Sequence, residues 1–187
     1  MKQPHVLHAL LWLVGILVLL CGCTGPSHPQ TQIPASPFAP ARQLKPERTP
    51  PSSCPATPVY QGGQGTISGT AAVPWVQAQP PASGIRGYLF YAQSPTTKSG
   101  TYRFLHTGGG YPDGSATKIL WIVDHPLASG PLHIDGANLS RPGKTFHQTI
   151  EGSGEIPSIV VVPSPGCWRL QIISGNAHGT LILWVVE

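Results

Sequence analysis

The sequence predicts a small all-β domain, an antiparallel β-sandwich or barrel, on three observations. Only 10% of the 187 residues are charged, while glycine and proline number 22 each, a composition that favours turns and extended segments over helices. After Tyr60, short runs rich in Val, Ile, Leu, Trp and Tyr alternate with turns of Gly, Pro, Asn and Asp. The chain also has room for one domain of ordinary size. We therefore expect a single β-domain over residues 59–187.

Nine runs are predicted to form its strands. They lie near residues 65–70, 85–92, 101–106, 117–123, 131–134, 145–150, 158–162, 168–173 and 180–186. The run 168–173 alternates apolar and polar residues, which predicts one buried and one solvated face. The runs Ile119–Val123 and Leu181–Val186 are apolar on both faces, which predicts central strands. The last two strands are expected to form a hairpin around residues 174–177.

Residues 1–22 are typical of an export signal. A single cation, Lys2, precedes an apolar run over residues 6–20, and small residues follow. The alternative is an uncleaved signal anchor, because residues 9–25 are nearly long enough to cross a bilayer. The short apolar run and the lack of a cationic stop after it favour cleavage.

The leader ends in Leu20-Cys21-Gly22-Cys23, which resembles the lipobox of bacterial lipoproteins. In that motif a small residue precedes the cysteine that receives a diacylglycerol thioether and becomes the new N-terminus. Cys23 fits this role, whereas Cys21 would follow the bulky Leu20. We predict lipidation at Cys23 and membrane attachment through the lipid, with the domain outside the cytoplasm, at the cell membrane or outer membrane. If the cell has an outer membrane, Thr24 permits sorting to it, because many Gram-negative lipoproteins carry Asp at this place as the signal for retention in the inner membrane.

Residues 23–58 are predicted to be a disordered linker. The stretch after Cys23 holds ten of the 22 prolines among Ser, Thr, Gln and Ala, with few periodic apolar residues to bury. As extended polyproline II it would span roughly 110 Å. A Pro-rich peptide ligand is the alternative, but only scattered prolines support it.

Two further cysteines, Cys54 and Cys167, remain once the leader is removed and Cys23 carries lipid. Disulfides persist outside the cytoplasm, so we expect these two to pair and to tie the end of the linker to the penultimate strand. The alternative is that both are free thiols, with Cys167 acting as a small buried residue.

Four segments resemble a group of bacterial secreted and lipoprotein β-domains. They are Lys-Ile-Leu-Trp-Ile at 118–122, Pro-Leu-His-Ile-Asp-Gly-Ala-Asn-Leu at 131–139, Pro-Ser-Ile at 157–159, and Pro-Ser-Pro-Gly-Cys-Trp at 163–168. The Pro-Gly-Cys-Trp element is the specific one. The resemblance covers residues 54–187 and implies an Ig-like β-sandwich, export and an upstream partner cysteine such as Cys54, with no established activity. Ile122 departs from the second aromatic residue of that pattern.

The candidate functional residues are few. His133 and Asp135 lie two apart on one predicted strand and share a face, so a metal site is conceivable, although ordinary solvated residues are the favoured alternative. Asp124-His125 could join them. Trp75, in a Pro/Gly-rich stretch, could contact a ligand, although packing over the end of the sandwich is favoured. The glycines at 108–110 lack the residues of a phosphate loop and predict a hairpin tip.

The sequence therefore predicts a non-enzymatic envelope lipoprotein whose domain binds an envelope protein or a cell-wall component. No cofactor is predicted, and the scattered basic residues do not suggest nucleic acid. A secreted hydrolase or metal-dependent enzyme with a dispersed site is the alternative, although no Gly-x-Ser-x-Gly or His-Glu-x-x-His motif is present. An enzyme should show a deep polar pocket, whereas a binding module should show flat faces or an open sheet edge.

Overall fold

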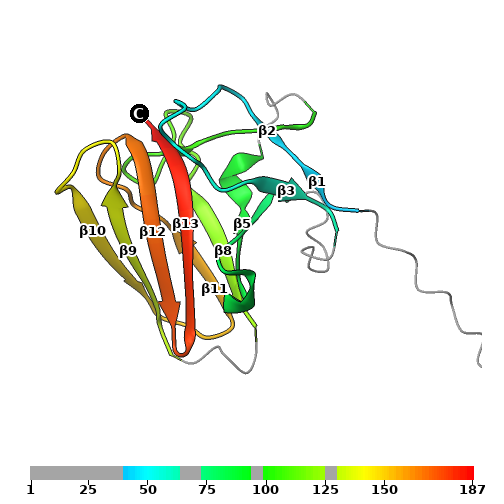
Figure 1. Cartoon of the computed structure of the whole chain (residues 1–187), viewed down its shortest axis with the longest axis vertical. Helices are drawn as coiled ribbons and strands as arrows, with labels where there is room; N and C mark the ends of the chain where they lie inside the picture. Colours follow the sequence, from blue (N-terminus) through cyan, green and yellow to red (C-terminus); the bar gives the residue numbers. More distant parts are fainter. Residues whose placement is uncertain (1–39, 64–72, 94–98, 125–129) are drawn as a thin grey trace, which may run out of the picture. The chain divides into compact units, whose positions relative to one another are not determined.

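The computed structural model describes residues 40–63, 73–93, 99–124 and 130–187, and these residues are mostly β-strand. Two main sheets pack around a shared core (Figure 1). The predicted all-β class is confirmed. Among the described residues, no helix has the length and apolar character that crossing a membrane requires.

The first sheet has six strands, and every neighbouring pair in it is antiparallel. In sheet order the strands are β1 (Arg42–Gln43), β3 (Val59–Gln61), β4 (Trp75–Gln77), β5 (Ile85–Leu89), β8 (Lys118–Val123) and β11 (Glu155–Ile159). β8 lies between β5 and β11, which confirms the prediction that Ile119–Val123 is central.

The second sheet has five strands. In order they are β10 (Thr145–Ile150), β9 (Leu132–Asn138), β12 (Gly166–Ser174), β13 (Ala177–Val186) and β7 (Leu105–His106). β12 and β13 form the predicted hairpin, closed by the Ser174–Ala177 pair. Two pairings are parallel and depart from the antiparallel prediction: β13 with β7, and the small sheet of β2 (Lys45–Pro46) with β6 (Thr101–Tyr102).

Several strand boundaries differ from the predictions for physical reasons. β1 to β4 span only two or three residues each, too few for an alternating pattern to show. β11 begins at Glu155, three residues before the predicted start. It includes Pro157, which a strand tolerates at the edge of a sheet because no partner there needs the missing N–H. The run 85–92 ends in a 3-10 helix, η2 (Phe90–Ala92), and another, η1 (Pro81–Ser83), precedes β5. The predicted strand at 65–70 lies outside the described residues.

The predicted linker ends too late. Residues 40–58, which were predicted to be linker, belong to the folded unit and include β1 and β2. Leu44 is 4% exposed within the main core. A segment rich in proline can therefore pack closely, because two buried side chains, those of Leu44 and Cys54, attach it to the domain.

Inward side chains of both sheets build one core. In β12 the burial alternates from Trp168 to Ile172, as predicted. Trp121 and Trp168 are fully buried, one from each sheet. The Trp121 indole N–H donates to Ser158 Oγ at 3.0 Å, so its polar atom is satisfied inside the core.

Gly136 makes room for an aromatic ring at the β9–β10 pair. A Cβ atom at this position would lie 2.1 Å from Cε1 of Phe146, whose ring packs on Trp168 with 5.3 Å between centroids. We expect Gly136→Ala to lower the free energy of unfolding by about 1–3 kcal/mol. Gly110→Ala is the matched control, because its Cβ atom would lie in ordinary van der Waals contact, 3.6 Å from the Ser115 carbonyl oxygen. Urea titration of both variants checks this, and equal losses would contradict it.

Candidate functional site

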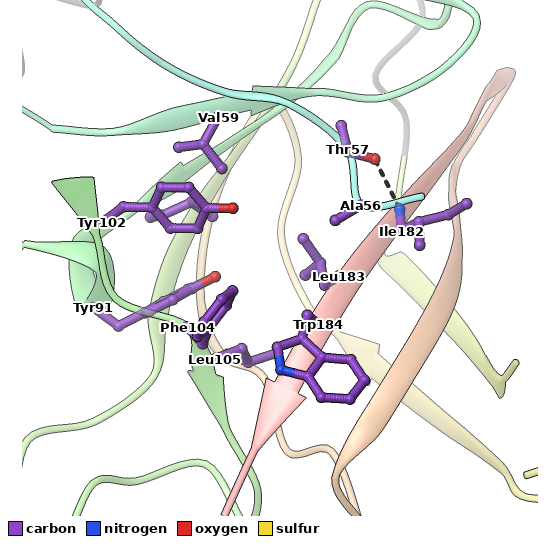
Figure 2. A pocket seen from close by; sticks show the side chains of 11 residues that line it. Ala56, Thr57, Val59, Tyr91, Tyr102, Phe104, Leu105, Ile182, Leu183 and Trp184 are labelled. Carbon is purple, nitrogen blue, oxygen red and sulfur yellow. Dashed lines mark hydrogen bonds between the residues drawn. The ribbon is translucent and has the colours of Figure 1, made fainter. Parts of the chain in front are cut away.

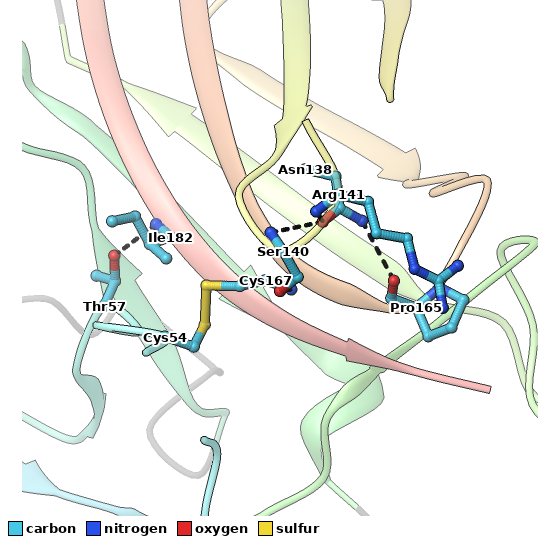
Figure 3. Close-up of a disulfide and its surroundings, with 8 residues drawn as sticks. All are labelled: Cys54, Thr57, Asn138, Ser140, Arg141, Pro165, Cys167 and Ile182. Carbon is cyan, nitrogen blue, oxygen red and sulfur yellow. Dashed lines mark hydrogen bonds between the residues drawn. A yellow bond between two sulfur atoms is a disulfide. The ribbon is translucent and has the colours of Figure 1, made fainter. Parts of the chain in front are cut away.

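Cys54 and Cys167 form a disulfide, as predicted (Figure 3). Their Cα atoms are 5.5 Å apart and 113 residues separate them in the chain. The two residues are 6% and 1% exposed, so the bond is shielded from solvent. Cys23, the predicted lipidation site, lies outside the described residues.

Residues 54–59, which we call the strap, run along β13. The Thr57 backbone N–H donates to the Ile182 carbonyl at 2.8 Å. The Ile182 N–H donates to Thr57 Oγ1, also at 2.8 Å (Figures 2 and 3). Gln79 bridges Thr180 on the same strand, and β7 pairs with the last residues. The backbone groups on the side of β13 away from β12 therefore bond to several short segments of the chain. A strand, β7, pairs with this side only at the end of β13.

The amide side chain of Asn138, the last residue of β9, contacts the Pro-Ser-Pro-Gly-Cys-Trp segment and the turn after β9. Asn138 Oδ1 accepts hydrogen bonds from the backbone N–H groups of Ser140 and Arg141, each at 2.9 Å, and Asn138 Nδ2 donates to the Pro165 carbonyl at 3.2 Å (Figure 3). Gly166 has φ +132°, and a Cβ atom at this position would lie only 3.0 Å from Nδ2 of Asn138. The disulfide is thus held on a rigid turn, which gives the segment a structural role.

The strap also forms one wall of a small pocket (Figure 2). η2, the β6–β7 region and β13 supply the other walls, and most lining atoms belong to apolar side chains. The space inside it that a water-sized group can reach is about 10 Å³, roughly enough for one water molecule. Ligand pockets usually hold about 300–1,000 Å³, so this hollow is far too small for an ordinary organic ligand.

Two phenols supply the polar character of the pocket. The hydroxyl groups of Tyr91 and Tyr102 both turn into it (Figure 2). Burial raises the pKa of Tyr102 to about 12, and burial raises the pKa of Tyr91 well above its usual value, with Tyr111 and Tyr102 adding to the effect. Both groups therefore stay protonated at neutral pH and can donate hydrogen bonds.

His106, in β7 beside this pocket, makes stability depend on pH. Burial lowers its pKa below 6.5, and the Arg103 guanidinium lowers that pKa further, while its ring lies 4.3 Å from that of Tyr111. The folded state binds this proton more weakly than the unfolded chain does. The contribution of neutral His106 to the free energy of unfolding is therefore complete above about pH 6.5, and it is lost as the pH falls through the folded-state pKa of His106.

We expect His106→Gln to lose less stability than the wild type between about pH 7.5 and pH 5. Urea unfolding at both pH values measures this difference. A variant whose stability falls as steeply as that of the wild type would show that His106 does not contribute.

The predicted pair His133 and Asp135 lies on the solvent face of β9, and β10 adds two partners. Asp135 Oδ1 lies 2.7 Å from Nδ1 of His147, whose Nε2 lies 2.9 Å from Thr149 Oγ1. Nδ1 of His133 lies 3.1 Å from the same hydroxyl. We call these four residues the polar network. One set of neutral tautomers satisfies it, with His133 donating to Thr149, Thr149 to His147 and His147 to Asp135.

The polar network does not resemble a metal centre. The described residues contain no group of three or more His, Cys, Asp or Glu side chains arranged to hold a metal ion. His133 and Asp135 share a face, as predicted, but bond to different partners. Asp124 pairs with Arg86 on the other sheet, and His125 lies outside the described residues.

A second apolar group lies on the opposite side of the six-stranded sheet from the core. We call it the outer aromatic cluster: Tyr60, Val73, Trp75, Tyr88, Phe90, Leu120 and Ile122. Strand register aligns four of its members in a row across the sheet, in the order Tyr60, Trp75, Tyr88 and Leu120.

Trp75 serves mainly as packing within the outer aromatic cluster. It is 9% exposed, its indole N–H donates to the Gly62 carbonyl at 3.0 Å, and the Tyr60 ring lies 5.1 Å away. Tyr60, Phe90 and Leu120 are only partly buried, so these residues offer more contact surface. Sequence reasoning singled out Trp75 and missed its more exposed neighbours, because the row exists only through strand register.

His147 and Thr149 were also missed. Part of the signal lies in the sequence: the run 145–150 alternates, and in the observed register with β9 it places His147 opposite Asp135. Only the register of that pair, which the sequence does not specify, identifies the contact.

Comparison with known proteins adds little. No protein-family model matches the chain, and no curated protein does. One crystal structure, of a protein from Bacillus anthracis provisionally described as a lipoprotein, aligns with a TM-score of 0.40 and 17% identity, over 75% of this chain and 99% of the other.

Proposed function

We propose that this chain is an exported bacterial lipoprotein, cleaved before Cys23 and anchored by lipid on that cysteine, whose β-domain binds an envelope protein without catalysing a reaction. The leader and the lipobox-like residues support the anchor. The Cys54–Cys167 disulfide supports export, because such bonds persist outside the cytoplasm.

The outer aromatic cluster carries the binding half of this proposal. Tyr, Trp, Phe and Arg are enriched at protein interfaces, and here aromatic residues lie beside Arg86 on one sheet face. Charged groups surround them: Lys118 lies 5.5 Å from the Phe90 ring, and Arg86 pairs with Asp124. An apolar centre with a polar rim is the usual anatomy of a protein interface.

The proposal extends to fold type. We place the two sheets with the Ig-like sandwiches, supported by their mostly antiparallel pairing and by the buried Trp168 next to a cystine.

Affinity capture from native membranes tests binding, with the full lipidated chain as bait. We expect a protein captured by the wild type to be lost with Tyr60→Ala/Phe90→Ala. Gln171→Ala, exposed on the other sheet, is the matched control and should capture it normally. Thermal unfolding of each bait checks that it is folded.

Two results would contradict the proposal. Unchanged capture by the Tyr60/Phe90 variant would exclude the outer aromatic cluster as the interface. Co-sedimentation of the wild type with purified peptidoglycan, lost in the same variant, would show that the cluster binds a cell-wall polymer instead of a protein.

One observation favours a second candidate, a hydrolase. Thr149, His147 and Asp135 are bonded in the order hydroxyl, imidazole, carboxylate, which is the order of a nucleophile, its base and the orienting acid. Against it, the side chains of His147 and Asp135 are 57% and 50% exposed on a sheet face, where water weakens their polarisation of the hydroxyl.

A fluorophosphonate probe distinguishes the candidates. In a hydrolase, Thr149 Oγ would bond to phosphorus, fluoride would leave and His147 would take the hydroxyl proton. Labelling of the wild type that disappears in Thr149→Val would support the hydrolase. We expect no labelling in either protein.

A further inference from the structure

We propose that the pocket beside the strap binds one water molecule, which bridges the hydroxyl groups of Tyr91 and Tyr102. The two phenols come from different elements, η2 and β6, and both hydroxyl groups turn into the pocket (Figure 2). The space that a water-sized group can reach there is about 10 Å³, close to the least that holds one water. The size of the pocket therefore selects water over any larger polar ligand.

The two hydroxyl groups need a partner that the described part of the chain does not supply. Both residues are more than nine-tenths buried, with Tyr91 5% exposed and Tyr102 8% exposed. Each hydroxyl group carries one donor and acceptor lone pairs. Within the residues that the structure describes, no backbone or side-chain group forms a hydrogen bond with either hydroxyl. A hydroxyl group buried without a hydrogen bond costs stability, so a bridging water is favoured.

The polar groups around the pocket are already paired. The backbone N–H and Oγ1 of Thr57, on the strap wall, both bond to Ile182. The Tyr111 hydroxyl, near Tyr91, donates to the Phe104 carbonyl. The remaining lining atoms are mostly apolar.

A water in the pocket therefore turns to the two phenols. Both phenols stay protonated at neutral pH, because burial raises the pKa of Tyr102 to about 12 and that of Tyr91 well above its usual value. The water accepts a hydrogen bond from one phenol and donates one to the other, and two bonds are enough to hold a buried water.

A double-mutant cycle on the full-length lipidated chain tests the shared water. Tyr91→Phe and Tyr102→Phe should each raise the unfolding equilibrium constant about tenfold, because the other hydroxyl and the water then lose a partner. Tyr91→Phe/Tyr102→Phe should raise it by no more than about tenfold, because both losses concern the same water. Urea titration of all four proteins in one detergent measures these changes.

The matched control cycle combines Tyr102→Phe with Tyr111→Phe. The Tyr111 hydroxyl has a carbonyl partner of its own, and Tyr111 does not line the pocket. The two effects on the unfolding equilibrium constant should therefore multiply.

Oxygen-17 relaxation dispersion, which counts the water molecules held inside a protein, tests the site directly. The wild type should hold one more water than Tyr91→Phe/Tyr102→Phe, and Tyr111→Phe should match the wild type. Equal counts for the wild type and the double variant would overturn the proposal. A double variant weakened about hundredfold would also overturn it, because each hydroxyl would then have a separate partner.

This test is independent of the proposed function. The pocket shares no lining residue with the outer aromatic cluster, so failure of the water site leaves the membrane-capture experiment unaffected.

Discussion

Replacing Cys54 and Cys167 together by serine is expected to lower the free energy of unfolding by up to about 5 kcal/mol. The cystine closes a loop between residues 113 apart, and in the chain-entropy model a loop of this length restricts the unfolded chain by about that amount. This loss would approach the whole stability of a typical domain, about 5–15 kcal/mol. Urea titration of the oxidised wild type and the double variant measures it.

The effect should have a local signature. The strap remains attached through Thr57 and Ile182, but its attachment at Cys54 is lost. Hydrogen exchange at the Ile182 amide should therefore accelerate more than exchange in β8, whose backbone bonds to β5 and β11 and not to the strap. A variant less than about 1 kcal/mol weaker than the wild type would show that packing holds the strap without the cystine.

Trp168→Ala is expected to cost about 3–5 kcal/mol, the second large effect. The side chain is fully buried, its indole N–H donates to the Ser164 carbonyl at 2.8 Å, and its ring contacts that of Phe146. Truncation leaves a cavity between the sheets and removes the donor from the partly buried Ser164 carbonyl.

Trp184→Ala is the matched control, with the same change of side chain on the neighbouring strand β13. Trp184 is only partly buried at the pocket wall, so we expect a loss below about 2 kcal/mol. Trp168→Leu keeps part of the volume and allows a measurement if the alanine variant does not fold. Equal losses for the two tryptophans would contradict the assigned packing.

How much of the fold is predictable depends on strand length. β10 was predicted with its observed bounds and β12 and β13 within a few residues, because runs of six or more residues show their alternation clearly. β1 to β4 are too short to show a period, and two of them, β1 and β2, lie in the segment that was predicted to be linker. The buried Leu44, alone among prolines and polar residues, gave no pattern to detect.

The candidate sites show the same division. The Cys54–Cys167 pairing followed from elimination among four cysteines, and the structure confirms it. The shared face of His133 and Asp135 followed from the period of a strand. Their contacts with β10, and the row from Tyr60 to Leu120, depend on register between strands distant in the chain, which turn chemistry and core packing set jointly.

Intact-mass spectrometry of the chain extracted from bacterial membranes tests the lipid anchor most directly. We expect the mass of residues 23–187 plus a diacylglycerol thioether on Cys23, less two hydrogens for the Cys54–Cys167 bond. Cys23→Ala should lose the lipid mass, whereas Cys21→Ala should keep it. A chain that retains residues 1–22, or one cleaved there without lipid, would contradict the proposed anchor.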